Sequence, residues 1–293
     1  MHKTELDRLA IGLMVVLCTI WGLQQVAIKL ASAGISPVWQ AGLRSLGATV
    51  IVVGWALIRG ARLFERDRTL WPGLLAGALF AGEFALIFIG LQYTTASRGV
   101  IFLYTAPFFV ALGAVWLLPQ EHMRRKQWTG MALAFVGVLA LFGENLFVPA
   151  AGAWVGDLML LGAALLWAAT TLTVKASALN RVSVEKTLLY QLGVSALLLP
   201  PLSLAMGEPG VFAPTAVVWA NLFFQTVIVA GVSYLAWFWL VREYPATRLS
   251  SFSFLTPVMG VLAGALILGE PLTPAVFAAL VLVGSGIWVA NRP

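Results

Sequence analysis

Long apolar stretches, separated by short polar or Gly/Pro-containing breaks, make up almost the whole chain. A run of about 20 apolar residues is long enough to cross the hydrocarbon core of a bilayer as an α-helix. Ten such runs cover residues 9–30, 37–58, 70–91, 96–118, 127–142, 154–174, 186–206, 217–241, 247–268 and 274–290. The pattern therefore predicts an all-α integral membrane protein with ten transmembrane helices and no soluble domain.

The composition agrees with a lipid environment. The chain is 60% hydrophobic and only 10% charged, with a mean hydropathy of +0.93, whereas soluble domains carry about 25% charged residues. The first apolar run is longer than the core of a signal peptide, so it is interpreted as a membrane helix. Cys18 is the only cysteine, which excludes an intrachain disulfide.

Basic residues gather on one side of the predicted membrane. Of the 18 lysines and arginines, 15 fall in the terminal segments and the even-numbered connections. Because positive residues favour the cytoplasmic side, we expect both termini to be cytoplasmic. Topology thus accounts for the net charge of +6 and the pI near 9.8, and nucleic acid is not expected as a partner.

The chain carries the same segment twice. Residues 166–175 resemble residues 20–29, with Trp21 and Trp167 separated by 146 positions, and Pro107 and Pro257 by 150. A slowly drifting offset is typical of a duplicated half with short insertions. We therefore expect a first five-helix repeat over residues 1–146 and a second over residues 147–293.

An odd number of helices in each repeat places the two copies in opposite orientations in the membrane. Such inverted repeats are typical of transporters that alternate between inward-open and outward-open states around a site near the bilayer midplane. Pro107 and Pro257 lie near the middle of spans four and nine, where each removes a backbone donor and bends its helix. They are interpreted either as paired hinges or as permanent bends.

Arg44 and Glu83 are the charged residues that a membrane span explains least. Each lies roughly 10–12 Å below the predicted outer boundary, on adjacent spans, at about 1.5 Å rise per residue. A charge at depth normally faces a partner or an aqueous cavity. The two residues could contact a substrate, Glu83 could carry a coupling proton, or the pair could be a buried salt bridge that joins two helices.

Polar and aromatic residues in the spans form a second set of candidates. Amides and hydroxyls within lipid need hydrogen-bond partners, so they are expected to face the interior of the bundle. Beside an indole, these amides and hydroxyls could bind a small amphipathic molecule. The alternative is that they serve packing between helices. The candidate substrate-binding residues of this kind are Trp21, Gln24, Gln25, Tyr104, Trp167, Thr171, Gln191, Tyr234 and Trp237.

The sequence also argues against several activities. It contains no phosphate-binding Gly-x-x-x-x-Gly-Lys stretch and no nucleophile elbow or zinc-protease helix, so neither an ATP-driven pump nor a familiar hydrolase is expected. Both histidines, His2 and His122, lie in polar segments, so neither a metal site in the membrane nor a cofactor is expected. The oligomeric state is left open, and a monomer is compatible with the sequence.

Several motifs together resemble the drug/metabolite transporter superfamily, and more narrowly its EamA-type ten-helix exporters. They are the two tryptophan segments, the paired Ala-Ser/Thr-Arg and mid-span proline positions, and the Gly-Glu-Pro-Leu-Thr stretch at 269–273. The resemblance covers essentially the whole chain. It implies a pore lined by spans one to four and six to nine, with spans five and ten behind.

Two stretches, residues 83–93 and 104–107, look like bacterial exporters of aromatic and other amino acids. By that resemblance Glu83, Tyr104 and Trp167 would line the cavity. Ala106 replaces the bulky aromatic residue expected before the proline, which argues against aromatic selectivity. The small quaternary-cation exporters of the superfamily use an acid in their first span, and this chain has none there.

We therefore expect a secondary transporter of the bacterial inner membrane that exports amino acids or related metabolites by alternating access. Its partners would be a small-molecule substrate and the lipid bilayer. Nucleobases or drugs are the alternative cargo. An intramembrane enzyme or a passive channel is the alternative of a different class.

Overall fold

A computed structural model describes residues 5–65, 67–94, 96–118, 120–121, 123–143, 152–268 and 274–292. In the first half the helices are α1 (Arg8–Ala31), α2 (Pro37–Ile58), α3 (Leu70–Gly90), α4 (Ala96–Leu103), α5 (Ala106–Leu117) and α6 (Arg125–Phe142). In the second half they are α7 (Ala153–Ala176), the 3₁₀ turn η2 (Ala178–Arg181), α8 (Val184–Ala205), α9 (Ala216–Phe223), the π-helix η3 (Phe224–Ser233), α10 (Tyr234–Glu243), α11 (Ala246–Phe252), α12 (Leu255–Leu268) and α13 (Pro274–Asn291).

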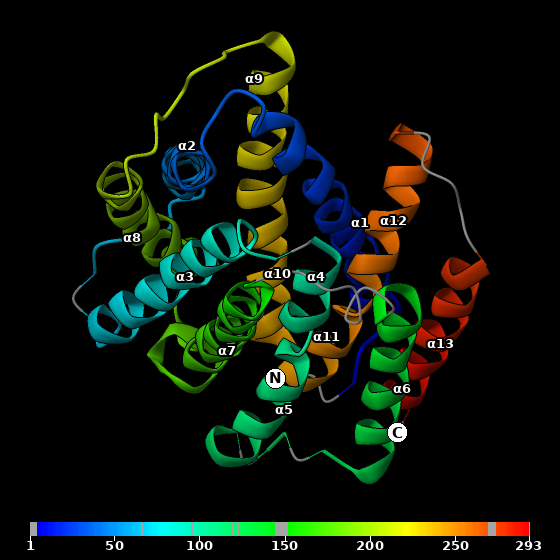
Figure 1. Cartoon of the computed structure of the whole chain (residues 1–293). Coiled ribbons are helices and arrows are strands. Elements are labelled where there is room, and N and C mark those ends of the chain that lie inside the picture. The colour runs from blue at the N-terminus through cyan, green and yellow to red at the C-terminus, as the bar shows by residue number, and fades with distance from the viewer. Residues whose placement is uncertain are drawn as a thin grey trace.

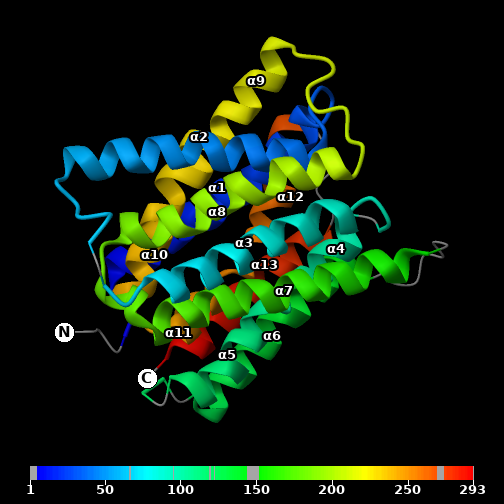
Figure 2. The same ribbon diagram turned by 90° about the vertical axis from the view of Figure 1, so that its left-hand side faces the viewer.

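The helices form one bundle in which segments of the two halves alternate. In the side view α2, α8, α3 and α7 follow one another, each in contact with the next (Figure 2). On the other side α1 contacts α12, α9 and η3. The pair formed by α6 and α13 lies at the flank opposite α2 and α8 (Figure 1). The interior of the bundle is therefore built from both halves of the chain.

Eight helices of the described part are long and apolar enough to cross a membrane. The set counts α4 with α5, and α9 with η3 and α10, as single spans, and it does not include α6 or the α11–α12 segment. Large apolar side chains on the outside of the bundle, such as Trp116 (84% exposed) and Leu266 (86% exposed), have no protein cover. An apolar surface of this extent requires lipid as the solvent.

Two of the expected spans are interrupted at matched places. Span four breaks at Tyr104 and Thr105, and span nine breaks at Ser253 and Phe254, so that α5 and α12 each begin with a proline in the first turn. A proline is tolerated there because the first amides of a helix have no intrahelical partner. Pro107 and Pro257 thus follow helix breaks and do not bend continuous helices.

Glycine contacts hold α6 against α13. A Cβ atom on Gly130 would lie 2.6 Å from the carbonyl oxygen of Gly286, and a Cβ on Gly286 would lie 2.6 Å from the oxygen of Gly130. The two backbones approach this closely because neither residue has a side chain. Gly130 and Gly286 therefore allow spans five and ten to pack closely, whereas a Cβ on Gly284 would meet nothing within 4 Å.

The connection between α2 and α3 is fastened to α8 by a buried lysine. The Nζ of Lys186 donates to Asp67 at 2.8 Å and to the carbonyl oxygen of Glu65 at 3.1 Å. These bonds, together with those from Thr69, lower the pKa of the Asp67 carboxyl to about 2. The loop is thereby held against the second half of the protein.

Candidate functional site

A cavity lies between the two halves, with an empty volume of about 720 Å³ that includes open solvent. Five segments supply its walls: α1, α3, the end of α4, α7 and α10. No residue of α6 or α13 is among its described lining residues. The lining residues are Trp21, Gln24, Phe80, Glu83, Phe84, Ile87, Leu103, Tyr104, Trp167, Thr170, Thr171, Tyr234, Trp237 and Phe238.

Aromatic rings form most of the wall, and they pack edge to face across the two halves. The ring centroids of Trp21 and Trp237 are 5.5 Å apart, and those of Tyr104 and Trp167 are 6.0 Å apart. The Trp21 indole donates to the hydroxyl of Ser233 at 3.0 Å, which fixes its orientation. Such pairs favour offset or T-shaped geometry because the ring edge is positive and the face negative. The indole of α1 and the phenol of α4 are therefore each held by the opposite half.

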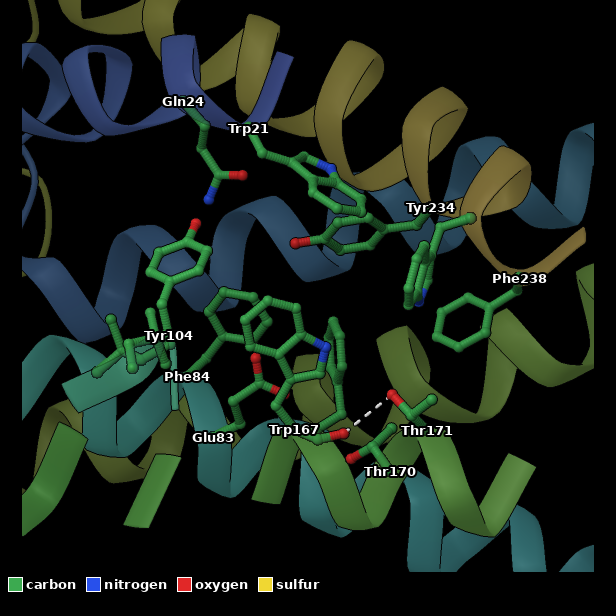
Figure 3. A pocket seen from close by; sticks show the side chains of 14 residues that line it. Trp21, Gln24, Glu83, Phe84, Tyr104, Trp167, Thr170, Thr171, Tyr234 and Phe238 are labelled. Carbon is green, nitrogen blue, oxygen red and sulfur yellow. Dashed lines mark hydrogen bonds between the residues drawn. The ribbon is translucent and has the colours of Figure 1, made fainter. Parts of the chain in front are cut away.

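Among the described residues of this wall, Glu83 supplies the only charged side chain. It lies on α3 and is 8% exposed. No hydrogen bond or ion pair to its carboxylate occurs among the described residues. Figure 3 shows the carboxylate beside Trp167, facing the space onto which the Tyr104 and Tyr234 side chains also open. A charged group without a protein partner, directed into a mostly apolar cavity, is typical of a binding site.

Arg44 does not form the buried salt bridge with Glu83 that was one of the three possibilities. Its side chain is completely buried in α2, and its guanidinium carbon lies 4.1 Å from the ring centroid of Phe84. No salt bridge within 4.0 Å joins it to Glu83, and its three side-chain nitrogens have no hydrogen-bond partner among the described residues. Arg44 therefore lies behind the cavity wall, within electrostatic range of Glu83 and Tyr234.

The polar candidates divide between the cavity and the packing of single helices. Gln24 and Thr171 line the cavity, and the Thr171 hydroxyl donates to the carbonyl oxygen of Trp167 at 3.1 Å, as the dashed line in Figure 3 marks. Gln191 is fully buried in α8, where its amide donates to the oxygen of Thr187 at 3.3 Å, and it does not reach the cavity. The side chain of Gln25 lies outside the described residues, as does the 269–273 motif.

Eight of the predicted binding residues thus meet at one cavity: Trp21, Gln24, Glu83, Tyr104, Trp167, Thr171, Tyr234 and Trp237. Several apolar lining residues were not expected from the sequence. Phe80, Phe84 and Ile87 occupy the same face of α3 as Glu83, since residues three and four apart lie together on a helix. That spacing could have identified them. Leu103 and Phe238 carry no comparable signal.

The described residues contain no group of three or more histidine, cysteine, aspartate or glutamate side chains that could hold a metal ion. The lining of the cavity offers stacking surfaces, hydroxyl and amide groups, and one carboxylate. A multi-pass helical membrane protein with such a central cavity belongs to the class of transporters.

Comparison with known proteins gives the family. The profile of the EamA-like transporter family matches residues 8–143 and 154–292, and the chain belongs to this family. The uncharacterized transporter YvbV of Bacillus subtilis is 29% identical over 95% of this chain and 90% of its own length. A probable amino-acid metabolite efflux pump of Salmonella typhimurium is 27% identical over 94% of this chain and 93% of its own length.

A protein described in the same words from Escherichia coli is also 27% identical, over 94% of this chain and 93% of its own length. The fold has a solved counterpart as well. A crystal structure with 20% sequence identity covers 97% of both chains with a TM-score of 0.83. The family assignment and the apolar helices identify a multi-pass protein of the inner membrane.

Proposed function

We propose that the protein is a secondary transporter that exports amino acids or related small metabolites across the bacterial inner membrane. The observation that carries this proposal is the Glu83 carboxylate, which lies unpaired in an aromatic cavity built from both halves. A ligand amine satisfies such a carboxylate, and the surrounding ring faces add cation–π attraction. The names of the two efflux pumps favour amino-acid metabolites over nucleobases or drugs as cargo.

The transport cycle proposed here is alternating access between two inverted five-helix repeats, residues 1–146 and 147–293. The family profile matches two segments that fall on these halves. The helix contacts are also paired: α2 meets its own counterpart α8, α6 meets α13, and the contact of α3 with α7 is matched by that of α1 with η3. This pattern supports a pseudo-twofold relation between the repeats, with α6 and the α11–α12 segment as the two remaining spans of ten.

Both termini are assigned to the cytoplasm from the distribution of basic residues. The start of α1 and the end of α13 lie at the same end of the bundle, in agreement with an even number of spans (Figure 2). The helix breaks before Pro107 and Pro257 occupy matched places in the repeats, which supports their role as hinges. A passive channel, one alternative, would require a continuous path across the membrane. An intramembrane enzyme, the other, would require turnover of a substrate at Glu83.

Counterflow into proteoliposomes tests the transport function. Vesicles loaded with a mixture of unlabelled amino acids should accumulate at least one labelled amino acid transiently and with saturation. Glu83→Gln and Trp167→Ala should abolish this uptake or change its apparent affinity at least tenfold. The controls are Glu65→Gln in an exposed loop and Trp116→Ala on the lipid-facing surface, which should transport like the parent.

Transport that is unaltered in both cavity variants would refute the site assignment. Uptake that rises linearly without saturation would identify a channel. An imposed proton gradient tests coupling. If the transport rate of the parent protein does not change with the gradient, Glu83 is excluded as a proton carrier.

A further inference from the structure

Arg44 presents an electrostatic problem that the described protein does not solve. A guanidinium group in the membrane interior normally has a partner, because an unpaired buried charge is strongly destabilising. Here no side-chain nitrogen of Arg44 meets a hydrogen-bond partner among the described residues; the Phe84 ring at 4.1 Å supplies cation–π attraction, and the Glu83 carboxyl and the Tyr234 phenol lie within electrostatic range. The positive charge is therefore available to act on whatever occupies the neighbouring cavity.

The cavity wall separates Arg44 from the ligand space by a single layer of side chains. Phe84 and Tyr234 line the cavity, and both lie beside Arg44 on its other face. Glu83 precedes Phe84 in α3, so a negative charge at the wall stands next to a positive charge behind it. Figure 3 shows the Tyr234 hydroxyl and the Glu83 carboxylate directed into the same space.

We propose that Arg44 and Glu83 form a two-charge subsite that selects a ligand carrying both an ammonium and a carboxylate group. This inference rests on the proposed transport function and names the charge class of its substrate. Glu83 contacts the ammonium group of the ligand. The carboxylate group of the ligand lies toward Phe84 and Tyr234, where the Tyr234 phenol donates a hydrogen bond to it and the positive charge of Arg44 attracts it electrostatically. Arg44 is thus a positioning residue. A ligand with only an amine leaves the charge of Arg44 uncompensated, and a ligand with only a carboxylate is repelled by Glu83.

Three compounds of nearly the same shape test the subsite: L-phenylalanine, phenethylamine without the carboxylate, and 3-phenylpropanoate without the ammonium group. Binding to the purified full-length protein is followed by quenching of tryptophan fluorescence, since Trp21, Trp167 and Trp237 line the cavity. The parent protein should bind phenylalanine at least about tenfold more tightly than either analogue. Arg44→Met should lose the preference over phenethylamine, and Glu83→Gln the preference over phenylpropanoate.

Arg44→Lys keeps the charge and should keep most of the preference, which separates electrostatics from packing. Methionine at this position removes a buried charge without a large loss of volume, so the variant is expected to fold. Equal weakening of all three compounds by Arg44→Met, or equal affinity of the parent for phenylalanine and phenethylamine, would overturn the proposal. So would the failure of all three to bind. Charge-selective binding without counterflow would instead refute the transport function alone.

A separate set of residues carries a second inference, which concerns the two ends of the cavity. The first clasp consists of Thr94, Arg98 and Asp157. The Thr94 hydroxyl donates to the Asp157 carboxylate at 2.7 Å, and the Arg98 guanidinium forms an ion pair with the same carboxylate. The clasp joins the α3–α4 connection of the first half to the beginning of α7 in the second half.

The second clasp consists of Glu5, Asp7, Tyr244 and Arg248. The Tyr244 hydroxyl donates to the Asp7 carboxylate at 2.8 Å, and Arg248 approaches Glu5 at 3.9 Å. This clasp joins the α10–α11 turn of the second half to the beginning of α1 in the first half. Tyr244 is also anchored through its backbone, because Lys175 donates to its carbonyl oxygen at 2.6 Å.

The two clasps are related by the repeat. Thr94 and Tyr244, like Arg98 and Arg248, are 150 positions apart. Thr94 and Arg98 reach Asp157 near the start of α7, and Tyr244 and Arg248 reach Asp7 and Glu5 just before α1. At 1.5 Å rise per residue, the cavity residues Trp167 on α7 and Trp21 on α1 lie about 15 Å and 21 Å from Asp157 and Asp7. Because α1 and α7 begin at opposite ends of the bundle (Figure 2), the clasps lie on opposite sides of the cavity.

We infer that the clasps are the two gates of the transporter, the first on the outer side and the second on the cytoplasmic side of the proposed topology. Both are formed in this structure. Opening one while the other stays closed exposes the cavity to one side only, as alternating access requires. The equilibrium between the two open states then depends on the difference in strength between the two sets of bonds.

Labelling of a cysteine in the cavity by a membrane-impermeant maleimide tests this inference in right-side-out vesicles. The background carries Cys18→Ser and the reporter Ile87→Cys. Asp157→Asn should raise the rate of labelling from outside by about tenfold, and Thr94→Val, which keeps the ion pair, by a smaller factor. Tyr244→Phe should lower the rate.

Glu65→Gln breaks an exposed pair with Arg62 and serves as the control, with an expected rate equal to the background. Size-exclusion profiles establish that each variant is folded, and Thr94→Val replaces Asp157→Asn if the latter is not. Changes in the same direction for both clasps, or no change for either, would refute the gating role. This test measures accessibility and not uptake, so its failure is distinguishable from a failure of the transport function.

Discussion

The contact between α6 and α13 allows a stability prediction in which one helix provides its own control. A Cβ atom on Gly286 would lie 2.4 Å from the backbone nitrogen of Ala134 and 2.6 Å from the oxygen of Gly130. A Cβ on Gly284, two residues earlier in the same helix, would meet nothing within 4 Å. The substitutions Gly286→Ala and Gly284→Ala therefore differ in their surroundings and share the same change in helix propensity.

The expected difference can be estimated because the shared term cancels. Replacing glycine by alanine inside a helix gains roughly 0.5–1 kcal/mol in either variant. At Gly286 the new methyl group meets backbone atoms, which cannot rotate away, and overpacking of this kind costs about 1–3 kcal/mol. Gly286→Ala should thus be less stable than Gly284→Ala by about 1–3 kcal/mol, with a melting temperature lower by roughly 2–6 °C.

Thermal unfolding in one detergent, at one scan rate and read by loss of the monodisperse size-exclusion peak, measures this difference. The scan rate must be fixed because membrane proteins often unfold irreversibly. Ligand binding should persist below the transition, since neither helix lines the cavity. Equal melting temperatures for the two variants would show that the close approach of α6 and α13 contributes nothing to stability, and the packing argument would be wrong.

Three further changes have defined outcomes. Asp67→Asn should lower the melting temperature at pH 7. The pKa of Asp67 in the folded protein is depressed to about 2, so its contribution to stability is present above about pH 4 and is lost as the pH falls toward 2. Between pH 5 and 8 the melting temperature of the parent should therefore show no dependence on pH that comes from Asp67. Trp21→Phe removes the indole bond to Ser233 and should weaken phenylalanine binding about three- to tenfold in the fluorescence titration, and an unchanged affinity would contradict a binding role for this indole. Pro107→Ala allows helix α5 to extend toward Tyr104 and should slow counterflow several-fold at unchanged affinity if the break is a hinge, whereas a parental rate would contradict the hinge role.

Much of the binding cavity was accessible from residue types alone. Gln24, Glu83 and Thr171 carry polar groups that are costly in hydrocarbon, so their direction toward the interior followed from that cost. Trp21 and Trp167 were singled out by the repeat. The reasoning from polarity also selected Gln191, which the structure places outside the cavity lining. Its side-chain nitrogen donates to Thr187 within α8, while its side-chain oxygen has no hydrogen-bond partner among the described residues. Sequence cannot distinguish a local hydrogen bond from one that crosses to another helix.

The expected salt bridge between Arg44 and Glu83 was based only on their similar depth in the membrane, which does not define the direction in which each side chain points. Both residues were placed at a similar depth correctly enough to bring them near each other, as their electrostatic interaction indicates. The rotation of α2 and α3 about their axes was not known, and it directs Arg44 behind the Phe84 ring while Glu83 faces the cavity. Rotation is decided by the packing of neighbouring helices, which involves residues far away in the chain.

The amino-acid sequence alone determined that the chain lies in a membrane, roughly where its helices begin and end, and which aromatic and polar side chains point inward, because these depend on local hydropathy and spacing. Only the tertiary structure decided that Asp157 closes onto Thr94 and Arg98, that Asp7 meets Tyr244, and that the guanidinium of Arg44 stays without a hydrogen bond. Those contacts join residues 59 to 237 positions apart, and no local pattern encodes which distant side chain a charged group will meet.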